Sequence, residues 1–286
     1  MLIDTHAHLD YPDFENDFQD VLARADAADV KRIITIGTSV ESSRRAVLLA
    51  EKFPQVFAVI GVHPTNAIEA GADVISELRE LAKSPRVAAI GETGLDYHHL
   101  PSGQILKPTP AWLAEMPLND PAEIAANIRD GAYKSAQAAL FQQQLELAVE
   151  TGLNVVIHQR DAWQDTLDIL ENYSGKVRGV FHCFGGAFEQ AQEVIRLGHM
   201  ISFTGIVTFK NAPLVHDCAT RVDAEKFMVE TDCPYLAPAP FRGKRCEPAH
   251  TRLVAEKIAS LRGKTLDEIA AQTTRNAEQF FRLDGK

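Results

Sequence analysis

The feature that most constrains the fold is a regular alternation of short apolar segments with amphipathic ones. The apolar segments are rich in β-branched residues and have the length of buried strands, whereas the segments between them have helical spacing. This alternation is typical of parallel βαβ units. The strand candidates lie near residues 2–6, 31–36, 56–61, 87–91, 154–158, 178–182, 199–203 and 227–231. Eight such strands favour a closed (β/α)8 barrel. An open doubly wound sheet is the alternative, but the sequence has no GxGxxG phosphate loop that would support it.

The length of 286 residues suits one barrel with an insertion, since a barrel takes about 250 residues. We therefore expect residues 1–286 to form a single unit. The extra length falls at about 98–133, where a Pro-rich stretch breaks the alternation after the fourth strand candidate. This insertion is expected to lie over the mouth of the barrel, either as a lid or substrate wall or as a surface excursion without a chemical role.

Charge and apolar content exclude some classes of protein. A net charge of −10 argues against a broad nucleic-acid-binding surface, although the RGKR segment at 242–245 offers a small basic patch. No apolar run approaches the roughly 18 residues that span a bilayer, and the first strand candidate leaves no room for a secretory signal. The four cysteines form no CxxC pair, which indicates reduced thiols. We expect a cytoplasmic protein with no membrane contact and no obligate protein partner.

The positions of the histidines point to chemistry. Five of the ten histidines, one glutamate and one aspartate lie at or just after the carboxyl end of a strand candidate. In a (β/α)8 barrel these ends converge on one face, where active sites lie. The groups expected to meet there are His6, His8, His63, Glu92, His158, His182 and Asp232.

The first strand candidate ends in an HxH pair, His6 and His8. Side chains of a strand alternate in direction, so both rings point to the same side and are well spaced for one divalent ion. Asp232 completes this first ion site. A lone His pair would more often be structural, and a lone Asp232 could cap a turn before Pro234.

Glu92 is expected to join two ion sites, because a carboxylate has two oxygens and can bridge two ions. Gly91 and Gly94 let the backbone turn tightly beside it. His158 and His182 would complete the second ion, although either one alone would more often be a hydrogen-bonded core histidine. Cys183 and Cys233 each lie beside a ligand candidate, but the surrounding histidines and carboxylates make a soft-metal role unfavourable.

Several motifs together resemble those of the TatD family of metal-dependent deoxyribonucleases. They run in order from Leu2 to Phe281, with the insertion excepted: HAHLD, GVHP, GETGLDY, VVIHQRDA, HCFGG, SFTGIVTFK, VETDCPYLAP and RGKRCEPA. The resemblance implies an amidohydrolase-like barrel with a two-metal phosphodiesterase site. The implied metal ligands are His6, His8, Glu92, His158, His182 and Asp232, and the GVHP histidine is His63. The long insertion departs from the family pattern and begins with His98 and His99, which either contact the site or lie exposed on a loop.

The expected chemistry follows from two ions about 3.5–4 Å apart, which lower the pKa of a shared water and hold both oxygens of an in-line displacement. Asp232 is then placed to act as general base, beside the bridging Glu92. His63 is not needed as a ligand, so we assign it to the scissile phosphate or the leaving oxygen. Guanidinium and ammonium groups suit phosphate contacts. The candidates for those contacts are Arg160, Arg242 and Arg245, together with Lys210 and Lys244.

The leading hypothesis is hydrolysis of DNA phosphodiester bonds with two Mg²⁺, Mn²⁺ or Zn²⁺ ions, from a 3′ end as the resemblance implies. One alternative is an amide or ester hydrolase of the same barrel group, such as a D-aminoacyl-tRNA deacylase. The bridging position holds Glu92, and no lysine occupies a matching strand end, which favours the nuclease. A binding protein with a vestigial site would have lost ligands, and all six are present.

Overall fold

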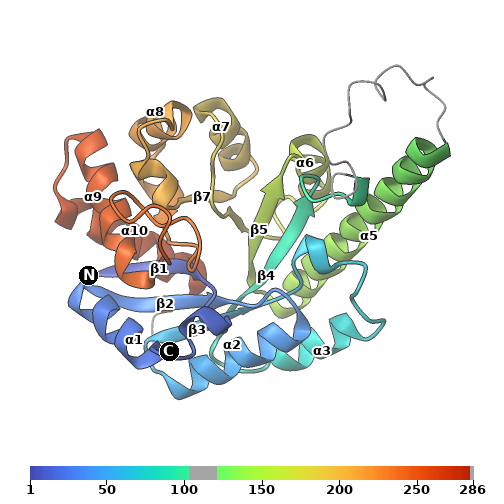
Figure 1. The fold of residues 1–286 in the computed structure, drawn as a ribbon, viewed down its shortest axis with the longest axis horizontal. Coiled ribbons are helices and arrows are strands. Elements are labelled where there is room, and N and C mark those ends of the chain that lie inside the picture. The colour runs from blue at the N-terminus through green and yellow to red at the C-terminus, as the bar shows by residue number, and fades with distance from the viewer. Residues whose placement is uncertain (103–120, 284–286) are drawn as a thin grey trace.

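The computed structural model describes residues 1–102 and 121–283, and its strands form a barrel with helices around it (Figure 1). Eight parallel strands pair in chain order in one sheet. They are β1 (Leu2–Ala7), β2 (Val30–Ile36), β3 (Val56–Ile60), β4 (Val87–Asp96), β5 (Asn154–Arg160), β6 (Gly179–Phe181), β7 (Met200–Phe203) and β8 (Phe227–Val229). The barrel nearly closes where the His8 N–H donates to the Cys233 carbonyl and the Asp232 N–H to the His6 carbonyl, both at 2.8 Å. The predicted (β/α)8 barrel is confirmed.

Helices follow the strands along the chain. They are α1 (Phe18–Ala27), α2 (Val40–Lys52), α3 (Val74–Leu81), α5 (Pro121–Thr151), α6 (Trp163–Glu171), α7 (Phe188–Arg196), α8 (Pro213–Arg221), α9 (Thr251–Arg262) and α10 (Leu266–Phe281), with short 3-10 turns η1 (Pro12–Phe14), η2 (Pro64–Asn66), η4 (Gly205–Thr208), η5 (Ala224–Lys226) and η6 (Pro248–His250). Local sequence sets their ends. Helix α10 begins with a capping box between Thr265 and Glu268, and α9 ends at Gly263 in the left-handed conformation. Within the described part of the chain, no helix combines the length and apolarity that crossing a bilayer requires. The cytoplasmic location stays a prediction.

The barrel interior below the site is filled by apolar side chains. Val156 and Val180 stand two positions before His158 and His182, so strand alternation points all four side chains to the same face. Phe280 and Phe281 of α10 belong to the same buried cluster. Because these apolar side chains fill the interior, only its end at the carboxyl ends of the strands, where the polar side chains lie, remains open.

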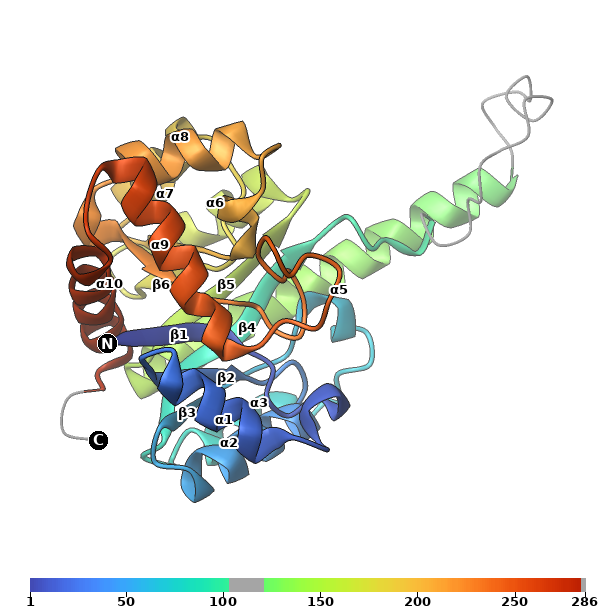
Figure 2. The ribbon, with the colours of Figure 1, turned by 60° about the vertical axis from the view of Figure 1, so that its left-hand side comes forward.

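Helix α5 corrects the predicted extent of the insertion. Residues 121–133 were expected to be irregular, but they form the first part of a helix that runs from Pro121 to Thr151. Proline is tolerated at the first helical position, where its missing N–H costs no hydrogen bond, and the Ala-rich sequence that follows favours a helix. This end of α5 extends well beyond the barrel in Figure 2. The rest of the irregular segment, 103–120, lies outside the described residues.

Two buried glutamines tie α5 to the strand ends. Gln137 Oε1 accepts a hydrogen bond from the Asp96 N–H at 2.9 Å, and Gln137 Nε2 donates one to the Asp96 carbonyl at 3.0 Å. Seven residues later, Gln144 accepts a hydrogen bond from the Val62 N–H and donates one to the Val62 carbonyl. It also donates to Thr93 Oγ1 at 2.7 Å. The helix thereby holds in place the end of β4, which carries Asp96, and the turn after β3, where Val62 directly precedes His63.

Replacement of Gln144 with leucine is expected to lower the free energy of unfolding by about 3 kcal/mol, because buried backbone groups of Val62 would lose their partners. Urea denaturation measures this change. Gln143→Leu is the matched control, because Gln143 lies on the exposed face of the same helix. Equal stability of the two variants would show that the Gln144 amide contributes nothing.

Candidate metal centre

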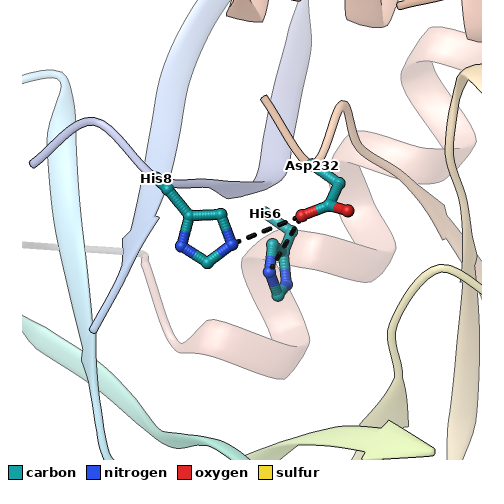
Figure 3. Close-up of side chains that lie close together, drawn as sticks. All are labelled: His6, His8 and Asp232. Atoms are coloured by element: carbon teal, nitrogen blue, oxygen red, sulfur yellow. Dashed lines mark ion pairs between the residues drawn. The ribbon is translucent and has the colours of Figure 1, made fainter. Parts of the chain in front are cut away.

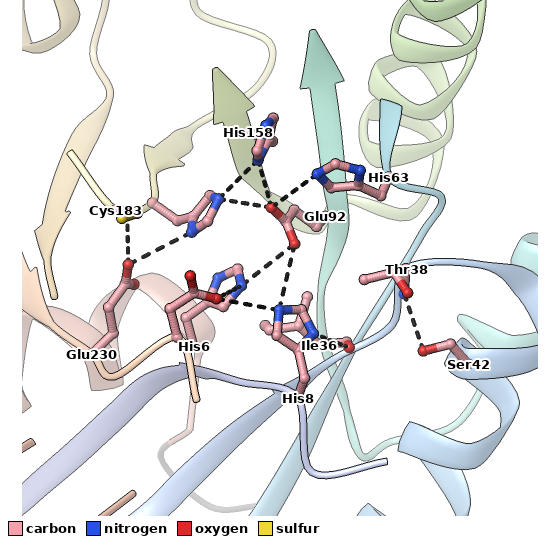
Figure 4. A network of polar contacts seen from close by, with 12 residues as sticks. His6, His8, Ile36, Thr38, Ser42, His63, Glu92, His158, Cys183 and Glu230 are labelled. Atoms are coloured by element: carbon pink, nitrogen blue, oxygen red, sulfur yellow. Dashed lines mark hydrogen bonds and ion pairs between the residues drawn. The ribbon is translucent and has the colours of Figure 1, made fainter. Parts of the chain in front are cut away.

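The carboxyl ends of the strands enclose a cavity of about 1090 Å³. Six of the seven groups predicted to meet at the strand ends line it, and the seventh, His6, is fully buried beneath them. Glu92 lies at the centre, and the histidines surround it (Figure 4). The structure therefore brings all seven predicted side chains together.

The first group of candidate metal ligands, called the first ligand group below, is His6, His8 and Asp232 (Figure 3). Asp232 Oδ1 lies 3.3 Å from His8 Nε2 and 3.7 Å from His6 Nε2. The other nitrogen of His8, Nδ1, lies 3.2 Å from the Ile36 carbonyl and donates to it, since a carbonyl only accepts. The Nε2 of neutral His8 therefore presents a lone pair to the carboxylate.

Positive charge is favoured at the point where these groups meet. Burial alone would lower the pKa of His8, but Asp232 and Glu92 raise it above its ordinary value. Among the described residues, neither ring nitrogen of the buried His6 makes a hydrogen bond. A buried polar group without a partner is costly. A divalent cation supplies both the missing partner and the positive charge, so these residues fit a metal ion.

The second group of candidate metal ligands, called the second ligand group below, is Glu92, His158 and His182. Glu92 Oε1 lies 2.8 Å from His158 Nδ1 and 2.7 Å from His182 Nε2, and the two ring nitrogens lie 3.2 Å apart. A second carboxylate stands behind each ring: Asp96 is 3.2 Å from His158 Nε2 and Glu230 is 3.7 Å from His182 Nδ1. A carboxylate at hydrogen-bond distance, as Asp96 is, holds the outer nitrogen of its histidine protonated and directs the inner lone pair to a metal. The longer contact of Glu230 is an ion pair, and His182 Nδ1 makes no hydrogen bond among the described residues.

The two oxygens of Glu92 face different ligand groups. Oε1 points to the second group, while Oε2 lies 3.5 Å from His6 Nε2 and 3.8 Å from His8 Nε2. Although burial alone would raise the pKa of Glu92, the neighbouring histidines hold it well below its ordinary value, so the group is a carboxylate. This arrangement suits a carboxylate shared by two cations.

Glycines allow β4 to pass close to β5 at this point. Gly94 has a φ of 145°, and a Cβ added to it would lie 1.9 Å from the His158 carbonyl oxygen. Gly91 has a φ of 140°, and its Cβ would lie 2.5 Å from the Val156 oxygen. A side chain at either position would push apart the strands that carry Glu92 and His158.

His63 is a neutral hydrogen-bond donor beside Glu92. Its Nδ1 accepts from the Thr65 N–H at 3.2 Å, so the ring proton is on Nε2, which lies 3.6 Å from Glu92 Oε1. Burial lowers the pKa of His63 to about 3. The ring therefore stays uncharged at neutral pH and presents an N–H to the cavity.

Asp96 and Glu230 are the residues that sequence reasoning missed. Both are buried, and Glu230 is further held by the Cys183 N–H and the Ser202 hydroxyl, each at 2.6 Å. A signal was present for Asp96, which lies four positions after Glu92 in the same strand, so alternation predicts a shared face. No such signal exists for Glu230, because it and Asp232 lie beyond the end of β8. Asp96 and Glu230 also belong to further groupings of potential ligands with the site histidines.

The two histidines and two cysteines whose roles the sequence leaves open lie in different surroundings. His99 lines the cavity and bonds Asp96 at 2.8 Å, whereas His98 pairs with Asp161 at 2.9 Å. The candidate ligand groups found among the described residues contain no cysteine, and Cys183 and Cys233 are free thiols. His99 thus reaches the candidate metal centre through the carboxylate of Asp96.

The predicted phosphate-binding arginines lie in different surroundings. Arg160 lines the cavity, but Arg242 and Arg245 are not among its lining residues. Arg245 forms a bidentate pair with Asp17, at 2.8 and 2.7 Å, and Arg242 lies 4.5 Å from the centre of the Phe209 ring. A phosphate-binding role for Arg242 and Arg245 stays a prediction, and Arg245 would first have to leave Asp17.

The fold and the site define a barrel hydrolase that depends on metal ions. Residues 3–282 match the family model for TatD related DNase. An uncharacterized metal-dependent hydrolase of Bacillus subtilis, YabD, is 37% identical over 99% of this chain and 100% of its own length. The 3′-5′ ssDNA/RNA exonuclease TatD of Enterobacter lignolyticus is 31% identical over 98% of each chain. The crystal structure of the Escherichia coli TatD homolog YJJV superposes with a TM-score of 0.82, at 26% identity over 98% of each chain. This chain belongs to the TatD-related DNase family and is a metal-dependent hydrolase.

Proposed function

We propose that this chain is a two-metal deoxyribonuclease that hydrolyses phosphodiester bonds at the 3′ end of DNA. The observation that carries the proposal is the position of Glu92, whose two oxygens face two separate ligand groups. The name of the Enterobacter relative, a 3′-5′ exonuclease acting on single strands, supports both the bond and the polarity.

The six ligands divide into two sets that share Glu92. His6, His8 and Asp232 would hold one ion, and His158 and His182 the other. Mixed imidazole and carboxylate ligands suit Zn²⁺ and Mn²⁺, and Mg²⁺ when water completes its shell. When bound, such a pair of ions makes a shared water more acidic and stabilises charge on the phosphate oxygens.

Asp232 is placed to take the proton of the attacking water. Burial alone would raise the pKa of Asp232, but His8 and His6 hold it below its ordinary value, so the group is ionised at neutral pH. Its backbone has a φ of 59°, which aspartate tolerates, and its N–H bonds the His6 carbonyl at 2.8 Å. The carboxylate is therefore fixed against β1, ready to accept a proton.

His63 and Arg160 would hold the phosphate. The Nε2–H of His63 is available to donate to a non-bridging oxygen or to the leaving oxygen. Because the His63 ring is neutral, it does not offset the negative charge of Glu92, which would attract the ions. Arg160, at the end of β5, lines the cavity and offers a planar pair of donors to a second phosphate.

A digestion assay with strands labelled at either end tests the proposal. We expect single-stranded DNA to be shortened from its 3′ end in Mg²⁺, Mn²⁺ or Zn²⁺, and a chelator to abolish the reaction. A 3′ label should then appear at once as mononucleotide, whereas a 5′ label should remain on progressively shorter strands. Cleavage of D-aminoacyl-tRNA or small acyl esters, with DNA left intact under every metal, would overturn the nuclease and favour the acyl-ester hydrolase.

A further inference from the structure

Two tyrosines form the wall of the cavity next to Asp232. Tyr11 stacks on the His8 ring with centroids 4.8 Å apart and an interplanar angle of 21°. Tyr235 meets Tyr11 edge-on at 6.3 Å and His8 at 6.4 Å. An aromatic surface therefore begins at a ligand of the first metal group and continues outward to the mouth of the cavity.

Tyr235 is exposed but held in place by its backbone. The residue is 54% exposed, although it lines the cavity. The Tyr235 N–H donates to the Asp232 carbonyl at 3.0 Å, and the adjacent Pro234 carbonyl accepts from Cys246 at 2.9 Å. A ring presented from such a fixed backbone loses little conformational freedom when a ligand packs against it.

The charge around the cavity argues for recognition by stacking. Among the described lining residues, Arg160 is the one side chain with a permanent positive charge, against four carboxylates, Glu92, Asp96, Asp161 and Asp232. Basic residues of the nearby loop do not line the cavity, and Arg245 is paired with Asp17. Apart from the ions, a polyanionic strand would gain little here from fixed charge, so its binding needs contacts to the bases.

We propose that Tyr235, supported by Tyr11, stacks against the unpaired base next to the scissile phosphate of a single-stranded nucleic acid. This inference rests on the proposed nuclease function and adds the residue that would contact a base of its substrate. Stacking on aromatic rings serves every base, so it requires no particular sequence. A base in a duplex already stacks and pairs, and must be freed first, so the wall favours single strands.

The test compares oligonucleotides with an intact 3′ end and with an abasic residue as the last or penultimate nucleotide. We expect the wild-type enzyme to cleave at least one abasic substrate about ten-fold less efficiently than the intact strand, as loss of one stacked base implies. Tyr235→Ala should lower kcat/KM for the intact strand by a similar factor and cancel the difference between the substrates. Tyr235→Phe should behave like the wild type, because it keeps the ring.

Phe241→Ala provides the matched control, because Phe241 is a partly exposed aromatic of the same loop that stacks on His250 and does not line the cavity. It should leave both substrates unaffected. Equal cleavage of intact and abasic strands by the wild type, or an effect of Tyr235→Phe as large as that of Tyr235→Ala, would overturn the stacking role while leaving the nuclease intact. No cleavage of any strand by metal-loaded wild type would instead refute the nuclease and the stacking inference with it.

Discussion

Replacing Glu92 with glutamine is expected to lower kcat/KM roughly a thousand-fold, equivalent to about 4 kcal/mol of transition-state stabilisation, and to weaken both metal sites together. The amide keeps the size of the side chain but loses the charge, and one of its two ends becomes a donor. Since Oε1 faces His158 and His182 while Oε2 faces His6 and His8, both ligand groups lose a negative oxygen. Steady-state kinetics and elemental analysis of the dialysed protein measure the two effects.

His158→Ala is the comparison for this experiment, because His158 belongs with Glu92 and His182 and, unlike His182, whose ring stacks on His6, shares no candidate ligand group with His6, His8 or Asp232. It should reduce mainly one ion, whereas Glu92→Gln should reduce both. If Glu92→Gln retained one ion at full occupancy and lost only the other, Glu92 would be an ordinary ligand of a single site.

Replacing Asp232 with asparagine is expected to lower kcat by about 10²–10⁴-fold, the range found for general acid–base groups, with a much smaller change in KM. An amide cannot accept the proton of the attacking water and is a poorer ligand for a hard cation. Kinetics at saturating metal, with the metal content measured in parallel, separate the loss of the base from the loss of the ion.

Asp161→Asn is the control for Asp232→Asn, because Asp161 also lines the cavity but its side chain is 64% exposed and pairs with His98 outside the ligand groups. It should change kcat little. Near-normal turnover of Asp232→Asn with a full complement of metal would show that another group accepts the proton.

The barrel and the site position could be predicted because both follow from local patterns. Strands of a parallel barrel are buried on both faces, so they are short apolar runs that can be found without knowledge of their neighbours. The side chains at their carboxyl ends must then share one face, which is why His6, Glu92, His158 and Asp232 could be grouped before their distances were known.

Features that depend on partners distant in sequence could not be predicted. The pairing of Arg245 with Asp17 joins residues 228 positions apart, and the bond from Gln137 to the Asp96 backbone spans 41. The same holds for the carboxylates behind the histidines: alternation places Asp96 on the correct face of β4, but its contact with His158 depends on how β4 and β5 pair. Helix α5 was partly missed because a preceding Pro-rich segment made its first turns look irregular.

Anomalous diffraction from crystals of the wild-type protein saturated with Mn²⁺ would show directly whether Glu92 joins two metal sites. We expect two peaks about 3.5–4 Å apart, one beside His6, His8 and Asp232 and the other beside His158 and His182, with one oxygen of Glu92 directed to each. A single peak at saturating Mn²⁺, or two peaks with Glu92 bound to only one of them, would contradict this expectation.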